Sequence, residues 1–212
     1  MDLRESLLIR YSSNLSIKVL AYLFTLACIT LFTGELYGFL YLFVPLGLDV
    51  YGAGLIRLNH PAFQEDVLDC LEEECLRACG IDKSKTFFPF YEITGSLDHW
   101  MLKELKTEVA YTMMAPKEDF VVIATRKGRI FPLKSYSKVA YAIDDAGTRD
   151  VYYDDISSVE LSGKVLAMAT AAGENIPFAA QGDHAEEAAA LLRQRLREYK
   201  SRRGEGPAVQ PT

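Results

Sequence analysis

Histidines and paired aspartates are the residues of this chain best suited to acid–base chemistry. Three separate segments hold the histidines, which are His60, His99 and His184. Adjacent aspartates stand at positions 144–145 and 154–155, where the side chains of neighbours in a strand or turn diverge. The chain contains no Gly-x-Ser-x-Gly, no glycine-rich phosphate loop and no His-Glu-x-x-His motif. We therefore expect no enzymatic activity, no catalytic residue and no cofactor.

Cys70, Cys75 and Cys79 are the closest approach to a metal-binding pattern, but their spacing does not fit one. Structural zinc sites usually combine two Cys-x2-Cys pairs, whereas Cys75 and Cys79 are four residues apart and no second pair follows. Free cysteine packs as a small hydrophobic side chain, so we expect buried thiols and no metal. The clustering also differs from a spaced disulfide framework, which favours a reducing compartment.

Basic side chains gather around one predicted β-turn, where they are candidates for binding phosphate groups. The candidate lipid-binding residues are Arg126, Lys127, Arg129, Lys134 and Lys138. Each basic residue near an anionic membrane surface contributes about 1 kcal/mol of attraction. The alternative is that these are solvated side chains of a turn, with no specific ligand.

Acidic side chains cover one face of a predicted helix further upstream. The candidate partner-binding residues are Glu65, Asp66, Asp69, Glu72 and Glu73. Anionic headgroups repel such a face, so the helix is expected to project from a membrane or to pair with a basic protein partner. The alternative is a face that only meets solvent. The net charge of −6 argues against nucleic acid as a partner.

These elements follow an apolar run with a single charge, Glu35, between Val19 and Leu48. The triplet Thr33-Gly34-Glu35 divides the run into two legs, residues 15–32 and residues 36–56. About twenty residues span a hydrocarbon core, so the sequence predicts a transmembrane helical hairpin over residues 15–57. A cleaved signal peptide, one long span with Glu35 buried, and a soluble apolar helical pair are the alternatives.

Basic residues set the expected orientation of the hairpin. Arg4, Arg10 and Lys18 precede or open the first leg, and Arg57 closes the second. The turn between the legs has no Lys or Arg, so the positive-inside rule places both termini in the cytoplasm. We therefore expect a multi-pass protein of the cell inner (cytoplasmic) membrane, preceded by a cytoplasmic N-terminus (1–14), with its soluble part facing the cytoplasm.

A helical connector with an aromatic segment is expected over residues 58–96. Its helix is predicted to begin at Asn59-His60-Pro61 and to end at Gly80. The apolar positions of that helix recur at helical spacing, at Phe63, Val67, Cys70, Leu71 and Cys75. The aromatic cluster at residues 86–91 is either a membrane-interface belt or a strand. A short helix is predicted over residues 97–106.

From Glu108 onward the pattern changes to short strands. Predicted strands cover residues 109–114, 120–125, 129–133, 139–143, 151–153, 159–161, 165–169 and 176–180. The turns between them are predicted at residues 126–128, 144–147, 162–163 and 173–175. A helix follows a capping box of Asp183 and Glu186, and its inner stripe is Ala185, Ala189, Leu192, Leu196 and Tyr199. Residues 201–212 have the composition of a disordered tail.

Three segments resemble the bacterial pleckstrin-homology-like family. They are Glu108-Val109-Ala110, the stretch from Val121 through Phe131, and Tyr153-Asp-Asp-Ile156-Ser-Ser-Val159. The resemblance covers roughly residues 97–199 and implies a seven-stranded antiparallel β-sandwich or barrel capped by a C-terminal helix. It implies binding or assembly without naming a ligand.

The expected fold class is therefore α+β, with the hairpin and connector preceding a domain at residues 97–200. The leading functional hypothesis is a membrane-anchored cytoplasmic adaptor that binds a protein partner or a second copy of itself. The alternative hypothesis is a sensor of anionic lipid headgroups that uses the basic turn.

Overall fold

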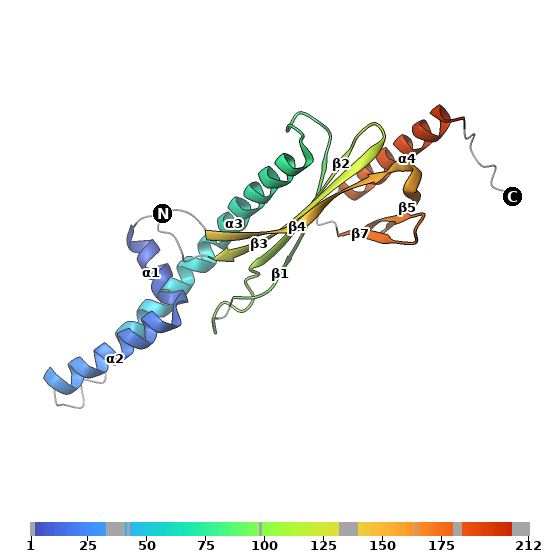
Figure 1. The fold of residues 1–212 in the computed structure, drawn as a ribbon. Helices are drawn as coiled ribbons and strands as arrows, with labels where there is room; N and C mark the ends of the chain where they lie inside the picture. The colour runs from blue at the N-terminus through green and yellow to red at the C-terminus, as the bar shows by residue number, and fades with distance from the viewer. Residues whose placement is uncertain are drawn as a thin grey trace. The chain divides into compact units, whose positions relative to one another are not determined.

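The protein is an α+β chain, seen in a computed structural model that describes residues 3–32, 41, 43–97, 99–131, 140–163, 165–179 and 184–204. Within these residues four α-helices accompany seven antiparallel strands (Figure 1). The helices are α1 (Leu3–Ser13), α2 (Leu15–Phe32), α3 (Phe43–Cys79) and α4 (His184–Arg202). The strands are β1 (Phe88–Thr94), β2 (Glu108–Pro116), β3 (Phe120–Phe131), β4 (Ala140–Tyr152), β5 (Ile156–Ser162), β6 (Val165–Thr170) and β7 (Asn175–Ala179). The expected α+β class is confirmed.

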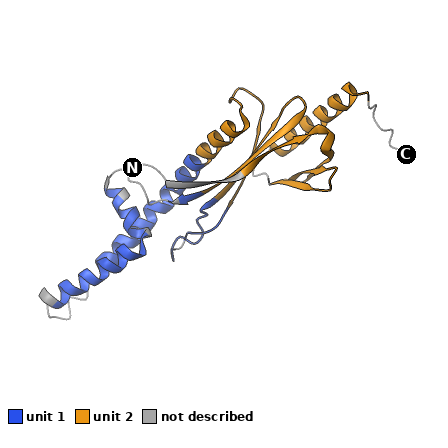
Figure 2. Ribbon diagram, viewed as in Figure 1, with its two compact units in different colours: residues 1–67, 94–108, 129–142 blue, residues 68–93, 109–128, 143–212 orange. Residues whose placement is uncertain are grey.

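The chain divides into two compact units, which Figure 2 colours separately. Unit 1 comprises residues 1–67, 94–108 and 129–142, and unit 2 comprises residues 68–93, 109–128 and 143–212. Residues 94–108 run from the last residue of β1 to the first residue of β2, and the boundary between residues 67 and 68 falls inside α3. The predicted domain limits, including the one at residue 97, stay predictions.

Helix α2 spans the residues predicted for the first apolar leg, Leu15–Phe32. Asn14 caps it, because its Oδ1 accepts hydrogen bonds from the backbone N–H groups of Ser16 at 3.1 Å and Ile17 at 3.4 Å. The predicted turn at residues 33–35 lies outside the described residues. No helix within the described residues has both the length and the apolar composition needed to cross a membrane.

Helix α3 continues through the point where a helix was predicted to begin. It runs unbroken from Phe43 to Cys79 with Pro61 in its interior, so the predicted start at Asn59-His60-Pro61 is wrong. Apolar positions on both sides of Pro61 are buried, and this burial outweighs the single backbone hydrogen bond that proline removes. The predicted end at Gly80 is confirmed, because Gly80 has φ +61° and its N–H donates to Arg77, while Ile81 N–H donates to Leu76.

The predicted apolar stripe of this helix is confirmed. Phe63, Val67, Leu71 and Cys75 are buried, and Cys70 is half-buried. Cys75 and Cys79 are buried thiols, as predicted, and the Cys75 thiol donates to the carbonyl oxygen of Ala124 at 3.6 Å. The four cysteines form no disulfide with one another, and Cys28 is half-buried in α2.

Strands β3 and β4 are each longer than predicted, because two predicted turns are absent. Residues 126–128 lie inside β3, where burial alternates through Ala124, Arg126, Gly128 and Ile130. Residues 144–147 lie inside β4, and Gly147 accommodates a φ of +115° there. A strand with one face buried keeps its period across a turn-forming dipeptide, which explains the error in β3.

The seven strands form two sheets, in the orders β1-β2-β3-β4 and β5-β6-β7. The aromatic segment contributes β1. The predicted strands at residues 120–125 and 129–133 contribute to the single strand β3, and those at residues 139–143 and 151–153 contribute to β4. The predicted turns at residues 162–163 and 173–175 are confirmed, since β5 pairs with β6 through Ser162↔Val165 and β6 with β7 through Ala169↔Asn175. A 3-10 turn at Tyr153–Asp155 links β4 to β5.

Unit 2 has a core in which α4 packs against the strands. Among its buried side chains are Phe90, Tyr153, Leu166, Phe178 and Leu192. The predicted inner stripe of α4 is confirmed, because Ala185, Ala189, Leu192 and Tyr199 are buried and Leu196 packs against them. Arg193 also contacts β5, where its guanidinium donates to the carbonyl oxygen of Val159 at 2.9 and 3.2 Å. Asp183, the predicted cap, lies outside the described residues.

Candidate functional site

The predicted basic cluster does not form as a group on one turn. Arg126 and Lys127 are neighbours on β3, so their side chains leave opposite faces of the strand. Arg126 is only 9% exposed and donates to the carbonyl oxygens of Thr125 at 2.9 Å and Gly147 at 3.3 Å. Lys127 is exposed, and Arg129 forms an ion pair with Glu108. Lys134 and Lys138 lie outside the described residues.

The predicted acidic face is partly solvated and partly used in internal contacts. Glu65, Asp66, Asp69 and Glu73 are exposed. Glu72 instead faces a strand, where it accepts a hydrogen bond from Tyr111 at 3.4 Å and pairs with Lys83 at 3.3 Å. Burial, together with the nearby carboxylate of Glu72, raises the pKa of Tyr111.

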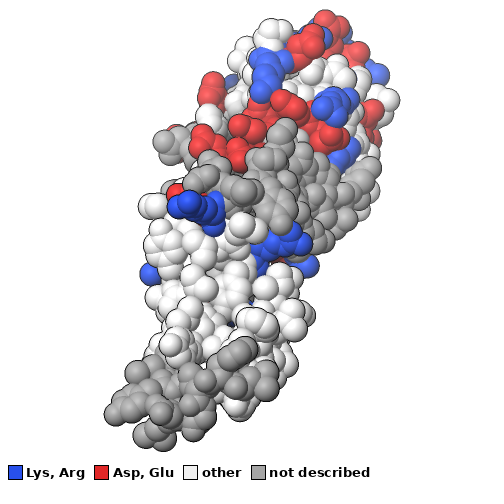
Figure 3. All heavy atoms as spheres, turned by 90° about the vertical axis from the view of Figure 1, so that its left-hand side faces the viewer, with Lys and Arg blue, Asp and Glu red and all other residues white. Residues whose placement is uncertain are grey.

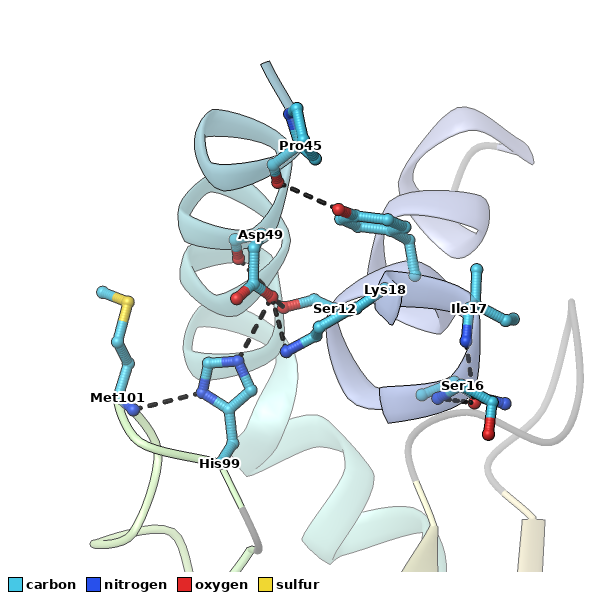
Figure 4. A network of polar contacts seen from close by, with 10 residues as sticks. Ser12, Ser16, Ile17, Lys18, Pro45, Asp49, His99 and Met101 are labelled. Carbon is cyan, nitrogen blue, oxygen red and sulfur yellow. Dashed lines mark hydrogen bonds and ion pairs between the residues drawn. The ribbon is translucent and has the colours of Figure 1, made fainter. Parts of the chain in front are cut away.

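A buried polar cluster around Asp49 is the most elaborate arrangement in unit 1, and sequence reasoning missed it. Asp49 lies in α3 and is 5% exposed. Its Oδ1 is approached by Lys18 Nζ at 2.7 Å, Ser12 Oγ at 2.9 Å and His99 Nε2 at 3.3 Å. Figure 4 shows these three side chains, from α2, α1 and the segment after β1, converging on the carboxylate. We call these four residues the Asp49 cluster.

Hydrogen bonding fixes the proton positions in the Asp49 cluster. The backbone N–H of Met101 donates to His99 Nδ1 at 3.1 Å, so Nδ1 carries no proton and Nε2 is the donor toward Asp49. Ser12 donates to Asp49 as well, both to its carboxylate and to its carbonyl oxygen at 2.9 Å. The His99 ring donates to Asp49 and accepts from Met101, so it offers no acceptor to the Ser12 hydroxyl. Ser12, His99 and Asp49 therefore lack the serine–histidine hydrogen bond of a nucleophile and its base. The Asp49 cluster instead connects α1, α2, α3 and the segment after β1.

Two opposite charges inside otherwise apolar helices were the available sequence signal for this cluster. Lys18 and Asp49 are the charged residues that interrupt the two predicted legs. Taken singly, each charge could also lie at a membrane interface, Lys18 by extending its side chain and Asp49 near the headgroups. Because an unpaired charge in apolar surroundings is costly, pairing the two was the stronger interpretation.

The predicted helix over residues 97–106 is instead a series of tight turns. Leu97 N–H bonds the carbonyl oxygen of Leu105, and Leu102 N–H bonds that of His99, both at 3.0 Å. His99 uses its ring nitrogen to take the Met101 N–H, so this backbone group is withdrawn from a helix. We call residues 97–106 the turn segment.

Three contacts hold the turn segment along α3. His99 meets Asp49, Glu104 forms an ion pair with Arg57, and the carbonyl oxygen of Lys106 lies 2.9 Å from His60 Nε2. Burial lowers the pKa of His60, and the contact with Lys106 opposes this shift. The turn segment and α3 therefore run in the same direction, with His99 toward the α3 amino terminus.

Large apolar side chains on α2 and on the first turns of α3 face outward. On α2 the exposed ones are Leu15, Val19, Leu20, Leu23, Phe24 and Leu26, and on α3 they include Phe43, Val44, Leu46, Leu48, Val50 and Tyr51. Phe24 is 70% exposed. In Figure 3 the described surface of the region that holds α2 is mainly white.

Unit 2 also contains an open groove of about 530 Å³, lined by residues of β2, β3, β4 and β7. Among its lining residues, Thr112 and Thr125 hydrogen-bond to each other at 3.1 Å, and Arg149 forms an ion pair with Glu174 at 2.6 Å. Among the residues that the structure describes, no group of three or more His, Cys, Asp or Glu side chains is arranged to hold a metal ion.

Two of the three segments that resemble the pleckstrin-homology-like family lie on strands, and the third begins in a 3-10 turn. Residues 108–110 open β2, residues 121–131 lie in β3, and residues 153–159 cover the 3-10 turn and part of β5. Comparisons of the whole chain with protein-family models, curated proteins and solved structures gave no match. The resemblance therefore depends on these segments alone.

Proposed function

We propose that the chain is a membrane-anchored cytoplasmic adaptor, held at the bilayer by α2 and the first part of α3. The observation that carries this proposal is the exposed apolar surface of these two helices. Every exposed position of α2 after Lys18 carries an uncharged side chain. Contiguous apolar surface of this kind marks a membrane or protein contact, and helices without a polar face are typical of membrane segments.

The placement of charges supports a hairpin that enters and leaves on the cytoplasmic side. Lys18 and Asp49 pair with each other in the Asp49 cluster. Most of the exposed apolar side chains lie on the hairpin side of this pair, after Lys18 in α2 and before Asp49 in α3. Residues 19–32 of α2 extend about 21 Å past Lys18, at 1.5 Å per residue. This length is less than the roughly 30 Å of a hydrocarbon core, so this part of α2 would enter the core without crossing it completely. Basic residues at Arg4, Arg10 and Arg57 flank the hairpin, as the positive-inside rule expects.

In the proposed adaptor, the part that binds other proteins includes the strands and α4. We infer that they form a pleckstrin-homology-like domain, a hypothesis supported by seven antiparallel strands, a C-terminal helix packed on β5, and the three family-like segments. Attachment to a bilayer raises the local concentration of such a domain, so that weak contacts with a protein partner or a second copy suffice. The exposed acidic residues Glu65, Asp66, Asp69 and Glu73 are the proposed contact surface for a basic partner.

The alternative is a sensor of anionic headgroups that uses the predicted basic turn, with Arg126, Lys127, Arg129, Lys134 and Lys138, and it has less support. The guanidinium of Arg126 is buried and engaged with Thr125, Gly147 and Thr148. A headgroup would have to compete with these acceptors.

Charge insertion into the apolar surface tests the membrane attachment. The full chain should remain with membranes after an alkaline carbonate wash, and Phe24→Asp combined with Leu20→Asp should release it, because each charge costs about 3 kcal/mol inside a bilayer. Tyr152→Asp is the matched control, since this aromatic residue is exposed in unit 2 and should have no effect. A parent chain that washes off, or a double variant that stays bound, would refute the proposal.

Partner capture tests the adaptor role. The full chain should co-purify with a specific protein from detergent-solubilised membranes, and charge reversal at Asp66 and Asp69 should remove that protein. Reversal of Lys127, an exposed residue outside the acidic face, should leave the capture unchanged. Equal capture by both variants would contradict the assignment of the acidic face.

A further inference from the structure

We propose that the turn segment is a second membrane contact, with Trp100 at the boundary between headgroups and acyl chains and Lys103 and Lys106 facing anionic phospholipid headgroups. This inference rests on the proposed membrane attachment and adds the depth and orientation of unit 1. The binding partner of this surface is the anionic cytoplasmic leaflet of the membrane.

Trp100 is exposed on a turn whose backbone and His99 side chain are held by hydrogen bonds. The side chain is 65% exposed, although its neighbours His99 and Leu102 are buried. His99 is held by Asp49 and by the Met101 N–H, and the Trp100 ring stacks on the His99 ring at a centroid distance of 6.2 Å. An exposed tryptophan fixed in this way presents a large amphipathic ring without the entropy cost of ordering a loop.

The contacts of the turn segment with α3 place Trp100 at the end of the apolar hairpin that is near Lys18 and Asp49. Trp100 follows His99 directly, and His99 bonds Asp49 at the point where Lys18 also meets that carboxylate. Beyond Lys18, α2 exposes uncharged side chains. Trp100 is therefore at the level where the charged part of unit 1 gives way to the apolar part. Tryptophan and tyrosine concentrate at this level in membrane proteins.

The rest of the turn segment has the charge that an anionic leaflet attracts. It continues from Trp100 toward the His60 contact of Lys106, away from the hairpin. Lys103 and Lys106 are exposed along this path. Glu104 is the one described acidic side chain of the segment, and its ion pair with Arg57 offsets its charge. Basic side chains thus follow the aromatic ring on the headgroup side, where phosphate groups lie.

The single tryptophan of the chain makes depth directly measurable. The full chain would be reconstituted into vesicles of phosphatidylcholine and phosphatidylglycerol whose acyl chains are brominated either near the carbonyl group or near the methyl end. Bromine quenches tryptophan at short range, so the ratio of the two quenching values reports depth. For Trp100 we expect strong quenching by the shallow bromines and weak quenching by the deep ones.

Two further single-tryptophan chains calibrate the result. Trp100→Phe combined with Phe24→Trp should be quenched best by the deep bromines, and Trp100→Phe combined with Tyr152→Trp should be quenched by neither. Circular dichroism would confirm that both variants keep the parent fold. If the tryptophan at position 24 is quenched while Trp100 is not, the hairpin attachment stands and this inference is wrong. If neither is quenched, the membrane proposal itself is wrong.

Substitution of the lysines tests the headgroup contact separately. Shallow quenching of Trp100 should be stronger in anionic vesicles than in vesicles of phosphatidylcholine alone. Lys103→Gln with Lys106→Gln should remove that difference, whereas Lys117→Gln, in unit 2, should preserve it. Equal quenching of the parent chain in both vesicle types would overturn the role assigned to the lysines.

Discussion

Replacing Gly52 by alanine tests how α1 docks on α3. A Cβ at position 52 would lie 2.6 Å from the carbonyl oxygen of Leu8 and 2.7 Å from Cβ of Ser12. Both neighbours belong to α1, and one is backbone, so α1 must move away. The hydrogen bonds from Tyr11 to the carbonyl oxygen of Pro45 and from Ser12 to Asp49 depend on that close approach.

The expected magnitude follows from the size of the clash. Overpacking by one methyl group in a well-packed contact typically costs about 1–3 kcal/mol. Because α3 stays helical when α1 detaches, the gain in helix propensity of alanine does not enter the opening equilibrium. The population with α1 detached should therefore rise by about 5- to 150-fold. Gly54→Ala is the matched control, since nothing lies within 4 Å of a Cβ at that position.

Trypsin cleavage after Arg10 measures this opening, because Arg10 is exposed on α1 and a protease needs an unfolded segment. The rate of appearance of the shortened chain, followed by mass spectrometry on the full-length protein in detergent, should rise for Gly52→Ala and match the parent for Gly54→Ala. Equal cleavage rates for the two variants would show that α1 is not held where the structure places it. Faster cleavage in both would point to a general weakening of α3.

Three other perturbations have defined outcomes. Leu192→Ala should lower the free energy of unfolding by about 2–5 kcal/mol in a denaturant titration, because this side chain is fully buried in the core of unit 2. Arg126→Met should cost about 1–3 kcal/mol, since it removes the hydrogen bonds that a buried guanidinium donates to the carbonyl oxygens of Thr125 and Gly147, whereas Lys127→Met on the exposed face should change stability by less than about 0.5 kcal/mol. His60 has a folded-state pKa below its ordinary value of 6.5, so the unfolded chain binds the proton more readily and stability should fall as pH drops below 6.5. His60→Leu should reduce that slope, and an unchanged slope would remove His60 from the explanation.

Local signals predicted the elements that local interactions determine. The boundaries of α2, the end of α3 at Gly80 and the inner stripe of α4 agree with the sequence pattern, because a cap, a left-handed glycine and a helical period are each read within a few residues. The same kind of signal was wrong at Pro61 and at residues 126–128. In both places burial over a long element outweighs a local preference for a break or a turn.

The candidate site was less predictable, because its residues are distant in the chain. Asp49 and His99 are separated by 50 positions, and Ser12 and Asp49 by 37. Spacing within a segment gives no information about such pairs. The prediction of a basic cluster was wrong because it relied on neighbouring residues at a turn. Residues 126–128 lie in a continuous strand, where successive side chains alternate between the two faces and Arg126 is separated from Lys127.

The sequence distance between Asp49 and His99 also has a consequence for how the chain is made. Ser12, Lys18 and Asp49 all leave the ribosome before His99, which follows Asp49 by 50 residues. At 5–20 residues per second, the delay is roughly 2 to 10 seconds. During that interval Asp49 has the donors of α1 and α2 but lacks the imidazole and the turns that carry it. The nascent helices thus form a partial assembly first, and translation of residues 97–106 completes it.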